Sequence, residues 1–166
     1  MIFPITRQLV ALDVETDGWG TPEESRIVEL GFRVEYHDGR PPARWCSLVN
    51  PGRPIKPYVT ERVHHITDQM MLCCRVCGLY NDDVAPDRCK CAGPEPDVSG
   101  FKPVPSFAQV AEKLARGFSN CDFCGYHVEF DLAVLAAEFK RAGVAWSRVD
   151  AKVFDPHALW RAVERR

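Results

Sequence analysis

Hydrophobic and polar residues alternate in the first fifty residues in the manner of β-strands. Four apolar residues lead into Asp13 within residues 7–14, and charged residues separate the apolar ones within residues 26–36. Such alternation places one face of a strand in a core and the other in water. Turn residues at 19–22, a hairpin at 37–40 and a third strand at 43–49 complete the pattern. The sequence therefore predicts a three-stranded antiparallel meander.

Helical spacing replaces this alternation in the second half of the chain. Apolar residues recur at intervals of three and four within 106–115 and 128–141, with Ser106 as a cap and Gly143 as a stop. Short apolar runs predict strands at 123–126 and 151–155, and a final helix starts at Pro156. A short helix is expected at 59–64, and another begins after Thr67, with Thr67 or Asp68 as its cap. This order predicts an α/β protein: a mixed sheet, formed by the meander and parallel strands, with helices packed on it.

Residues 73–104 interrupt the pattern and predict an inserted loop. The segment is rich in proline, has no sustained periodicity and holds five of the eight cysteines. Such a cluster indicates metal before disulfide in a reducing compartment. Two close pairs, Cys74 with Cys77 and Cys89 with Cys91, suit a structural Zn²⁺ site, and Cys73 is an alternative to Cys74. Free thiols or a redox pair are the other interpretations.

Two further cysteines flank a predicted helix-to-strand turn. We interpret Cys121 and Cys124 as structural residues, with Cys124 buried.

Composition bounds these expectations. A chain of 166 residues with 46% hydrophobic content can bury one core, so we expect one domain with an insertion. A net charge of -2 neither supports nor excludes a nucleic-acid partner. The sequence has no apolar run of membrane-spanning length and no leader pattern at its start. We therefore expect a cytoplasmic protein without a membrane partner.

Asp13 and Glu15 are the first candidate functional residues. Residues two apart on a strand point to the same face, so the two carboxylates lie side by side. Like charges this close raise each other's pKa unless a cation sits between them, and Mg²⁺ and Mn²⁺ prefer such oxygen ligands. A solvent-facing edge strand is the alternative for this segment taken alone.

Four segments carry a resemblance to a known family. Residues 13–16, 27–31, 63–68 and 125–131 follow one another along the chain. In this order they resemble two exonuclease motifs, and the segments between them, of the DEDD (DnaQ-like) 3′–5′ exonucleases of the RNase H-like superfamily. The resemblance covers about residues 7–71 and 105–160.

The resemblance implies an RNase H-like fold and hydrolysis of phosphodiester bonds at the 3′ ends of single-stranded DNA or RNA by a two-metal-ion mechanism. It implies that Asp13, Glu15 and Asp131 hold two Mg²⁺ or Mn²⁺ ions. By the same resemblance, Thr16, the backbone near Asp17 and Gly18, and the segment at His127 contact the substrate. A polymerase or another replication or repair protein is the implied partner.

The chain departs from the family at two motif positions. His127 stands where the family usually has Asn. A third motif, a His or Tyr four or five residues before a last Asp, has no counterpart, and residues 155–160 resemble the segment that precedes it. Without that motif, one metal ligand and the general base are missing, and His157 is a poor candidate for the base. We therefore expect an exonuclease domain at 1–166 that is C-terminally incomplete, and the activity of this chain by itself is an open question. A domain whose catalytic half is supplied elsewhere and an inactive relative are the alternatives.

Three residues near the motifs have less specific interpretations. His64 and His65 are expected in surface or capping roles, and Glu29 on the solvent side or in a salt bridge. The alternative function is a non-catalytic nucleic-acid or protein-binding module on a nuclease scaffold, with a structural zinc loop making the contact.

Overall fold

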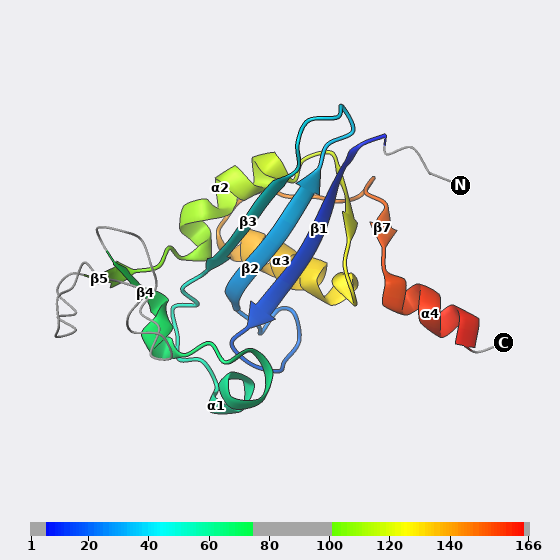
Figure 1. The fold of residues 1–166 in the computed structure, drawn as a ribbon. Helices are drawn as coiled ribbons and strands as arrows, with labels where there is room; N and C mark the ends of the chain where they lie inside the picture. Colours follow the sequence, from blue (N-terminus) through cyan, green and yellow to red (C-terminus); the bar gives the residue numbers. More distant parts are fainter. Residues whose placement is uncertain (1–5, 75–100, 165–166) are drawn as a thin grey trace.

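The computed structural model describes residues 6–74 and 101–164, and its centre is a five-stranded mixed sheet (Figure 1). The sheet order is β3-β2-β1-β6-β7. The strands are β1 (Gln8–Thr16), β2 (Ile27–Glu35), β3 (Ala43–Leu48), β6 (Cys121–Cys124) and β7 (Val153–Phe154). The first three pair antiparallel, β6 runs parallel to β1, and β7 runs parallel to β6. The predicted meander and the mixed α/β class are confirmed.

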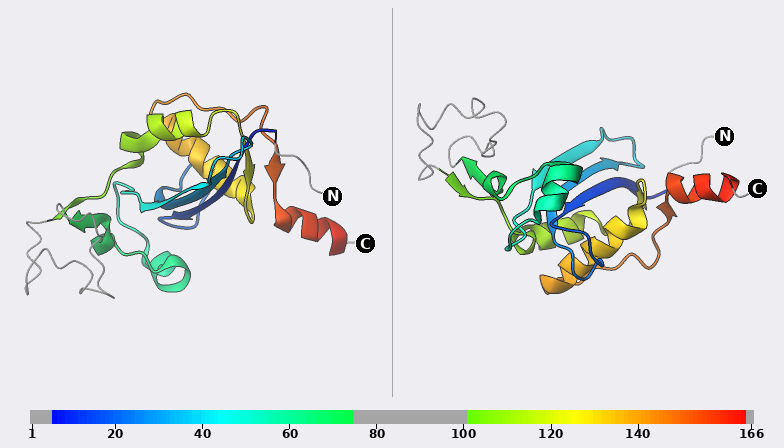
Figure 2. Two further views of the ribbon diagram at one scale, coloured as in Figure 1. Left: turned by 45° about the horizontal axis from the view of Figure 1, so that its top comes forward. Right: turned by 90° about the horizontal axis from the view of Figure 1, so that it is seen from below.

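Helices cover one face of this sheet. The two long ones, α2 (Phe107–Gly117) and α3 (Val128–Arg141), pack against each other, and Figure 2 shows both on the same side of the strands. The last helix, α4 (Pro156–Glu164), follows β7 and extends away from the sheet (Figure 1). The capping box of Ser106 and Gln109 starts α2 as the sequence predicts. None of the helices within the described ranges is long and apolar enough to cross a membrane.

Shorter turns follow β3. The helix α1 (Pro57–Val59) begins two residues before its predicted start, because a proline suits the first turn, and it continues as the π-helical turn η1 (Thr60–His64). A 3₁₀ turn, η2 (Asp68–Met71), comes next. Thr67 rather than Asp68 caps it, accepting the Met70 amide proton. Asp68 instead accepts a hydrogen bond from the Ile55 amide, with an N···O distance of 3.0 Å.

The alternation along β1 separates the core from the open face. Val10, Leu12 and Val14 are buried and pack with apolar residues of α2 and α3. Asp13 and Glu15 point to the opposite face, because successive side chains of a strand alternate. The same strand therefore anchors the core and presents two carboxylates outside it.

The predicted strand at 123–126 is shifted. β6 begins at Cys121 and ends at Cys124, and Gly125 starts the turn into α3. A Cβ atom at Gly125 would lie 2.5 Å from the Leu12 carbonyl oxygen, so the close approach of the two backbones requires glycine. Cys121 is buried, whereas Cys124 is half-buried and not buried as expected.

A second, two-stranded sheet lies at the base of the inserted segment. β4 (Leu72–Cys74) pairs antiparallel with β5 (Phe101–Pro103). Cys73 is a buried free thiol in a small core cluster with Val28 and Ile55, which makes it a packing residue. The other predicted zinc ligands, Cys77, Cys89 and Cys91, lie outside the described residues, and Cys74 ends β4. The predicted zinc site at 73–104 stays a prediction.

Candidate active site

The carboxyl end of β1 lies where the sheet changes from antiparallel to parallel pairing. β1 has an antiparallel neighbour on one side, β2, and a parallel neighbour on the other, β6. The pairing of β1 with β6 covers only Gln8 to Ala11, and beyond it β1 is paired on its β2 side alone. Ligand sites in α/β proteins form at such positions, outside the carboxyl ends of the strands. Asp13 and Glu15 lie on this part of β1, which has β2 as its neighbour on one side and no strand partner on the other.

Asp131 reaches the same region from the first turn of α3. Its side chain is buried, with 6% of its surface exposed. Burial, and next the negative charge of Asp13, raise the pKa of Asp131 to about 7, and Glu15 adds to the effect. A backbone hydrogen bond to Val14 opposes the rise. The electrostatic coupling of Asp131 to Asp13 and Glu15 means that the fold brings together the three acids that the sequence predicted.

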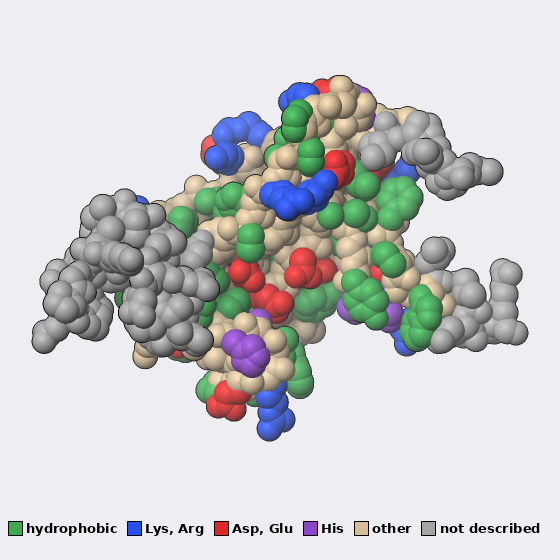
Figure 3. All heavy atoms as spheres, viewed as in Figure 1, with side chains coloured by type: hydrophobic (Ala, Val, Ile, Leu, Met, Phe, Trp, Pro, Cys, Tyr) green, Lys and Arg blue, Asp and Glu red, His purple; other side chains and the backbone are tan. Residues whose placement is uncertain are grey.

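Glu29 is a fourth acid at this place. Glu15 and Glu29 are direct cross-strand partners in the β1–β2 pair, and like charges in that position destabilise a sheet. Burial, then Asp13 and then Glu29 raise the pKa of Glu15. No salt bridge of Glu29 is found within the described residues, and its carboxylate accepts a hydrogen bond from the thiol of Cys46, with Sγ 3.5 Å from Oε1. Figure 3 shows acidic side chains gathered on the open face of the sheet.

Glu29 is half-buried on the open face of the sheet, which agrees with the expected solvent-side position, whereas the alternative of a salt bridge is not met within the described residues. The register of the predicted meander could have identified Glu29 as part of the site, because pairing across the turn at 19–22 sets Glu29 beside Glu15. We refer to Asp13, Glu15, Glu29 and Asp131 as the acid cluster.

The acid cluster is wider than a closed metal site. In the part of the chain that the structure describes, His127, Asp155 and His157 are the group whose ligand atoms all lie within 4.8 Å of one another. The acid cluster does not meet that limit. Its donors are nevertheless all carboxylate oxygens, the ligands that Mg²⁺ and Mn²⁺ prefer, so its chemistry fits these ions.

His64 fixes the end of β1. Its Nε2 atom lies 3.0 Å from the Thr16 carbonyl oxygen, and its Nδ1 atom accepts the Ile66 amide proton at 3.0 Å. The proton is therefore on Nε2, which donates to Thr16. Burial lowers the pKa of His64, which keeps the ring neutral. His64 is a half-buried positioning residue rather than a surface residue, whereas His65 is exposed and adopts a left-handed conformation with φ of 60°.

The loop after β1 is held by Asp17. Its side chain is 1% exposed, accepts the Arg26 amide proton at 2.8 Å and forms an ion pair with Arg53. Its backbone N–H and C=O bond to Arg26 and Lys56. These bonds use the Asp17 side chain and backbone for the loop itself. Contacts with a substrate at this loop therefore fall to its neighbours.

A cavity of about 400 Å³ opens beside this loop. It is lined by residues that include Gly18, Trp19, Arg53 and Lys56. Thr16 donates its hydroxyl proton to the Gly18 carbonyl, with a distance of 3.1 Å, and the Trp19 amide donates to the Tyr58 hydroxyl at 2.8 Å. Trp19 is 69% exposed, and its ring packs against Tyr58 with the centroids 5.2 Å apart. The loop thus presents a fixed aromatic ring next to two cationic side chains.

Glu138 is a buried acid that the helical pattern did not single out. Its carboxylate accepts the Ile27 amide proton at 3.2 Å and forms salt bridges with Arg26 and Arg141. Arg141 also donates to the carbonyl oxygens of Glu23 and Ser25. This network ties α3 to the start of β2. It therefore sets the position of Asp131 relative to the strands.

His127 lies at the start of α3 in a left-handed conformation, with φ of 59°. Its amide donates to Asp155 Oδ1 at 3.0 Å, and its ring lies 5.3 Å from that of His157. The residue that the resemblance assigns to substrate binding therefore belongs to a group with Asp155 and His157.

Comparison with known proteins adds no relative. No protein-family model matches the chain, and no curated protein matches it. The functional argument therefore rests on the residues and on their geometry.

Proposed function

We propose that this protein is a metal-dependent nuclease that removes nucleotides from the 3′ ends of single-stranded DNA or RNA. The observation that carries the proposal is the buried carboxyl of Asp131, which is hydrogen-bonded to the backbone of Val14, between Asp13 and Glu15 on β1. Acids from a strand and from a helix far along the sequence converge at one edge of the sheet. A stable protein has no structural reason to gather like charges in this way, whereas a site for divalent cations requires it.

An RNase H-like fold is part of the proposal. An antiparallel three-stranded meander continued by two parallel strands, with helices on one face, is the arrangement expected of it. The acids lie at the carboxyl end of the central strand, β1, where its neighbours run in opposite directions. The fold alone would not argue for catalysis, and the acid cluster supplies that argument.

Asp13, Glu15 and Asp131 would hold two Mg²⁺ or Mn²⁺ ions. When bound, such ions lower the pKa of a water molecule and stabilise the charge that develops on the phosphate oxygens. The protein contributes the positions of the acids: β1 fixes Asp13 and Glu15, and the Glu138 network fixes α3 and hence Asp131. Glu29 adds negative charge opposite Glu15 and strengthens the attraction for cations.

The open face of the sheet also offers positive charge for a phosphate backbone. Arg33 and Arg44 are cross-strand partners, two residues along the register from Gly31, which lies opposite Asp13. Arg44 is exposed, whereas Arg33 pairs with Glu35. The cations and acids together suit a polyanion that approaches a metal site.

The loop after β1 suits the terminal nucleotide. Trp19 offers a ring on which a base can stack, and base–aromatic stacking is worth about 1–3 kcal/mol. Arg53 and Lys56 line the adjacent cavity and can meet phosphate oxygens. Such contacts do not select a base, which agrees with an enzyme that degrades strands regardless of sequence.

The test is release of mononucleotides from a 3′-labelled single-stranded oligonucleotide with Mn²⁺ present, together with Mn²⁺ binding followed by paramagnetic broadening of amide NMR signals. We expect release that Asp13→Asn lowers at least about 100-fold, and broadening centred on residues 13–15 and 131 that the same variant abolishes. A matched control is Glu35→Gln, an acid on the same strand as Glu29 but at its far end, which keeps both properties.

The outcomes separate the candidate functions. Broadening at the acid cluster without release of nucleotides favours the binding module on a nuclease scaffold. No broadening at millimolar Mn²⁺ overturns the metal site and, with it, the proposed nuclease.

A further inference from the structure

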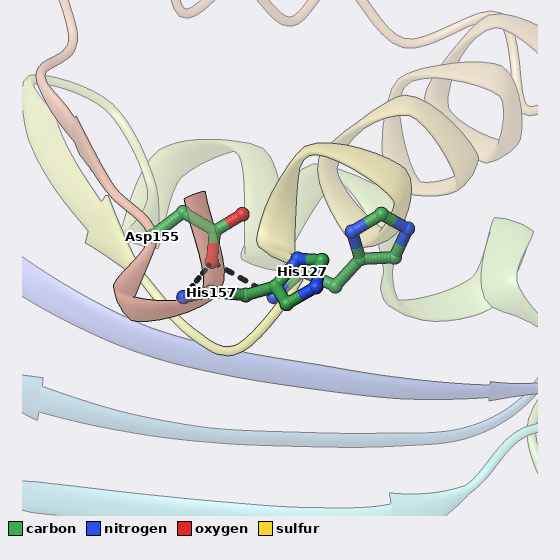
Figure 4. A group of neighbouring side chains, drawn as sticks. All are labelled: His127, Asp155 and His157. Carbon is green, nitrogen blue, oxygen red and sulfur yellow. Dashed lines mark hydrogen bonds between the residues drawn. The ribbon is translucent and has the colours of Figure 1, made fainter. Parts of the chain in front are cut away.

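A second cluster of metal-ligating side chains lies at the carboxyl ends of the parallel strands β6 and β7. There the chain enters α3 and α4, and His127, Asp155 and His157 meet (Figure 4). One ligand atom of each lies within 4.8 Å of the other two. We propose that these three residues bind a divalent transition-metal ion, with Zn²⁺ the best match. The site is independent of the nuclease proposed above.

The carboxylate of Asp155 is fixed before any ion arrives. Its Oδ1 atom accepts amide protons from His127 at 3.0 Å and from His157 at 2.9 Å, drawn as dashed lines in Figure 4. Although burial opposes it, these bonds and one from Ala158 hold the pKa of Asp155 below its ordinary value. An ionised carboxylate has about four lone-pair positions, so it can cap α4 and still ligate a cation.

The two imidazoles have no competing partner. Within the described ranges, neither ring of His127 and His157 has a hydrogen bond to its nitrogen atoms. The backbone amides of both residues donate to Asp155 instead. His157 is half-buried, with the Tyr126 ring centroid 4.9 Å away and that of Trp160 at 6.5 Å. The aromatic rings limit the motion of one ligand and leave its nitrogen lone pairs free.

The backbone at His127 supports a functional role for its position. A residue other than glycine with φ of 59° is strained, and such strain collects at ligand sites. Here the left-handed residue turns the chain from β6 into α3 and places its amide on Asp155. The histidine side chain is exposed, and its ring contacts that of His157.

The donor set selects the class of ion. Two imidazoles and one carboxylate, with a fourth position for water, form a three-ligand set typical of zinc sites, and imidazole disfavours Mg²⁺ and Ca²⁺. Zinc bonds of about 2.1 Å place ligand atoms roughly 3.4 Å apart, so atoms that lie up to 4.8 Å apart must close by up to about 1.4 Å. Rotation of the exposed His127 ring allows this. The helix N-termini oppose a cation with about half a charge each, which the full charge of Asp155 cancels.

The experiment is a titration of the protein with ZnCl₂ at pH 7.5, followed by the side-chain ¹⁵N signals of its histidines. Site-resolved signals separate this site from the predicted thiolate site and from the acid cluster. We expect the signals of His127 and His157 to shift together and to saturate at one ion for this site. His37, exposed in the hairpin between β2 and β3, supplies the control signal that does not move.

Two variants test the assignment of the ligands. Asp155→Asn keeps an oxygen to cap α4 but removes the charge, and His157→Gln leaves the cap untouched. Each should weaken Zn²⁺ binding at His127 at least about tenfold, whereas His37→Ala should leave it unchanged. If one variant fails to fold, the other decides. Histidine signals that stay in place at 1 mM Zn²⁺, or that shift equally in a folded variant, would overturn the site.

Discussion

The crowding of Asp131 predicts that Asp131→Asn stabilises the protein above pH 7 when Mg²⁺ and Mn²⁺ are left out. Burial first, and then the charge of Asp13, raise the pKa of Asp131 from its ordinary 3.8 to about 7. Between these values the folded state holds a proton that the unfolded state has released, so the free energy of unfolding falls as the pH rises through this range. Above pH 7 the Asp131 carboxyl is ionised in both states, so its contribution to the free energy of unfolding no longer changes with pH.

The magnitude follows from the same interval. Each pH unit is worth about 1.4 kcal/mol, which gives an upper limit of about 4 kcal/mol at pH 8. An asparagine has no charge to bury and no repulsion from Asp13 or Glu15, and its oxygen can still accept the hydrogen bond of Val14. The variant should therefore gain up to this amount at pH 8 and nearly nothing at pH 4.

Urea unfolding of both proteins between pH 4 and pH 8.5 measures the gain. Asp150→Asn, an exposed acid on the loop before β7, is the control and should show no such trend. Adding Mn²⁺ at 100 times its dissociation constant should stabilise the wild-type protein by about 2.7 kcal/mol and the variant by much less. A variant that is no more stable at pH 8, or that gains the same amount at pH 4 and pH 8, would refute the argument.

Three other predictions concern packing and metal. Glu138→Ala leaves the buried Ile27 amide without its acceptor and should lower the free energy of unfolding by about 2–3 kcal/mol, whereas Glu138→Gln should cost less, as urea unfolding will measure. Gly125→Ala should lower the free energy of unfolding by about 1–3 kcal/mol in the same assay, because its Cβ meets the Leu12 carbonyl oxygen. Gly117→Ala, with open space around the added Cβ, should show no such clash, and equal effects of the two variants would contradict the close approach at Gly125. Elemental analysis should find one equivalent of zinc per chain that Cys77→Ser and Cys89→Ser remove, whatever zinc the site at His127 holds. A difference of less than about half an equivalent between the wild-type protein and these variants would rule out the thiolate site.

Much of the fold follows from local pattern. The meander, α2 and α3 were predictable because each has a clear period of alternation or of helical spacing, and Ser106 caps where its position predicts. β6 was misplaced by two residues because its apolar run continues into a turn that only the Leu12 backbone, a tertiary neighbour, enforces. The ribbon of β4 and β5 was missed since three-residue strands joined across a long segment leave no local signal.

The candidate site, too, was predictable where residue identity and spacing sufficed and not where contacts between distant segments decide. Asp13, Glu15 and Asp131 were found from spacing and resemblance, which depend on residue identity alone. Glu29 required the register of two strands, and the bonds of His64 required contacts between segments far apart in the chain. Asp17 was predicted with the substrate-binding residues, but its carboxylate bonds the Arg26 amide and Arg53 within the protein. The sequence does not show which carboxylates are used in such internal contacts.

The pairing of β4 with β5 has a consequence for how this chain tolerates change. Cys74 and Phe101 are opposite each other in the ribbon, so the two ends of residues 75–100 leave the domain side by side. Closing such a gap needs only a tight turn of two residues. A two-residue turn in place of residues 75–100 should therefore leave unchanged the register of the sheet that carries the acids.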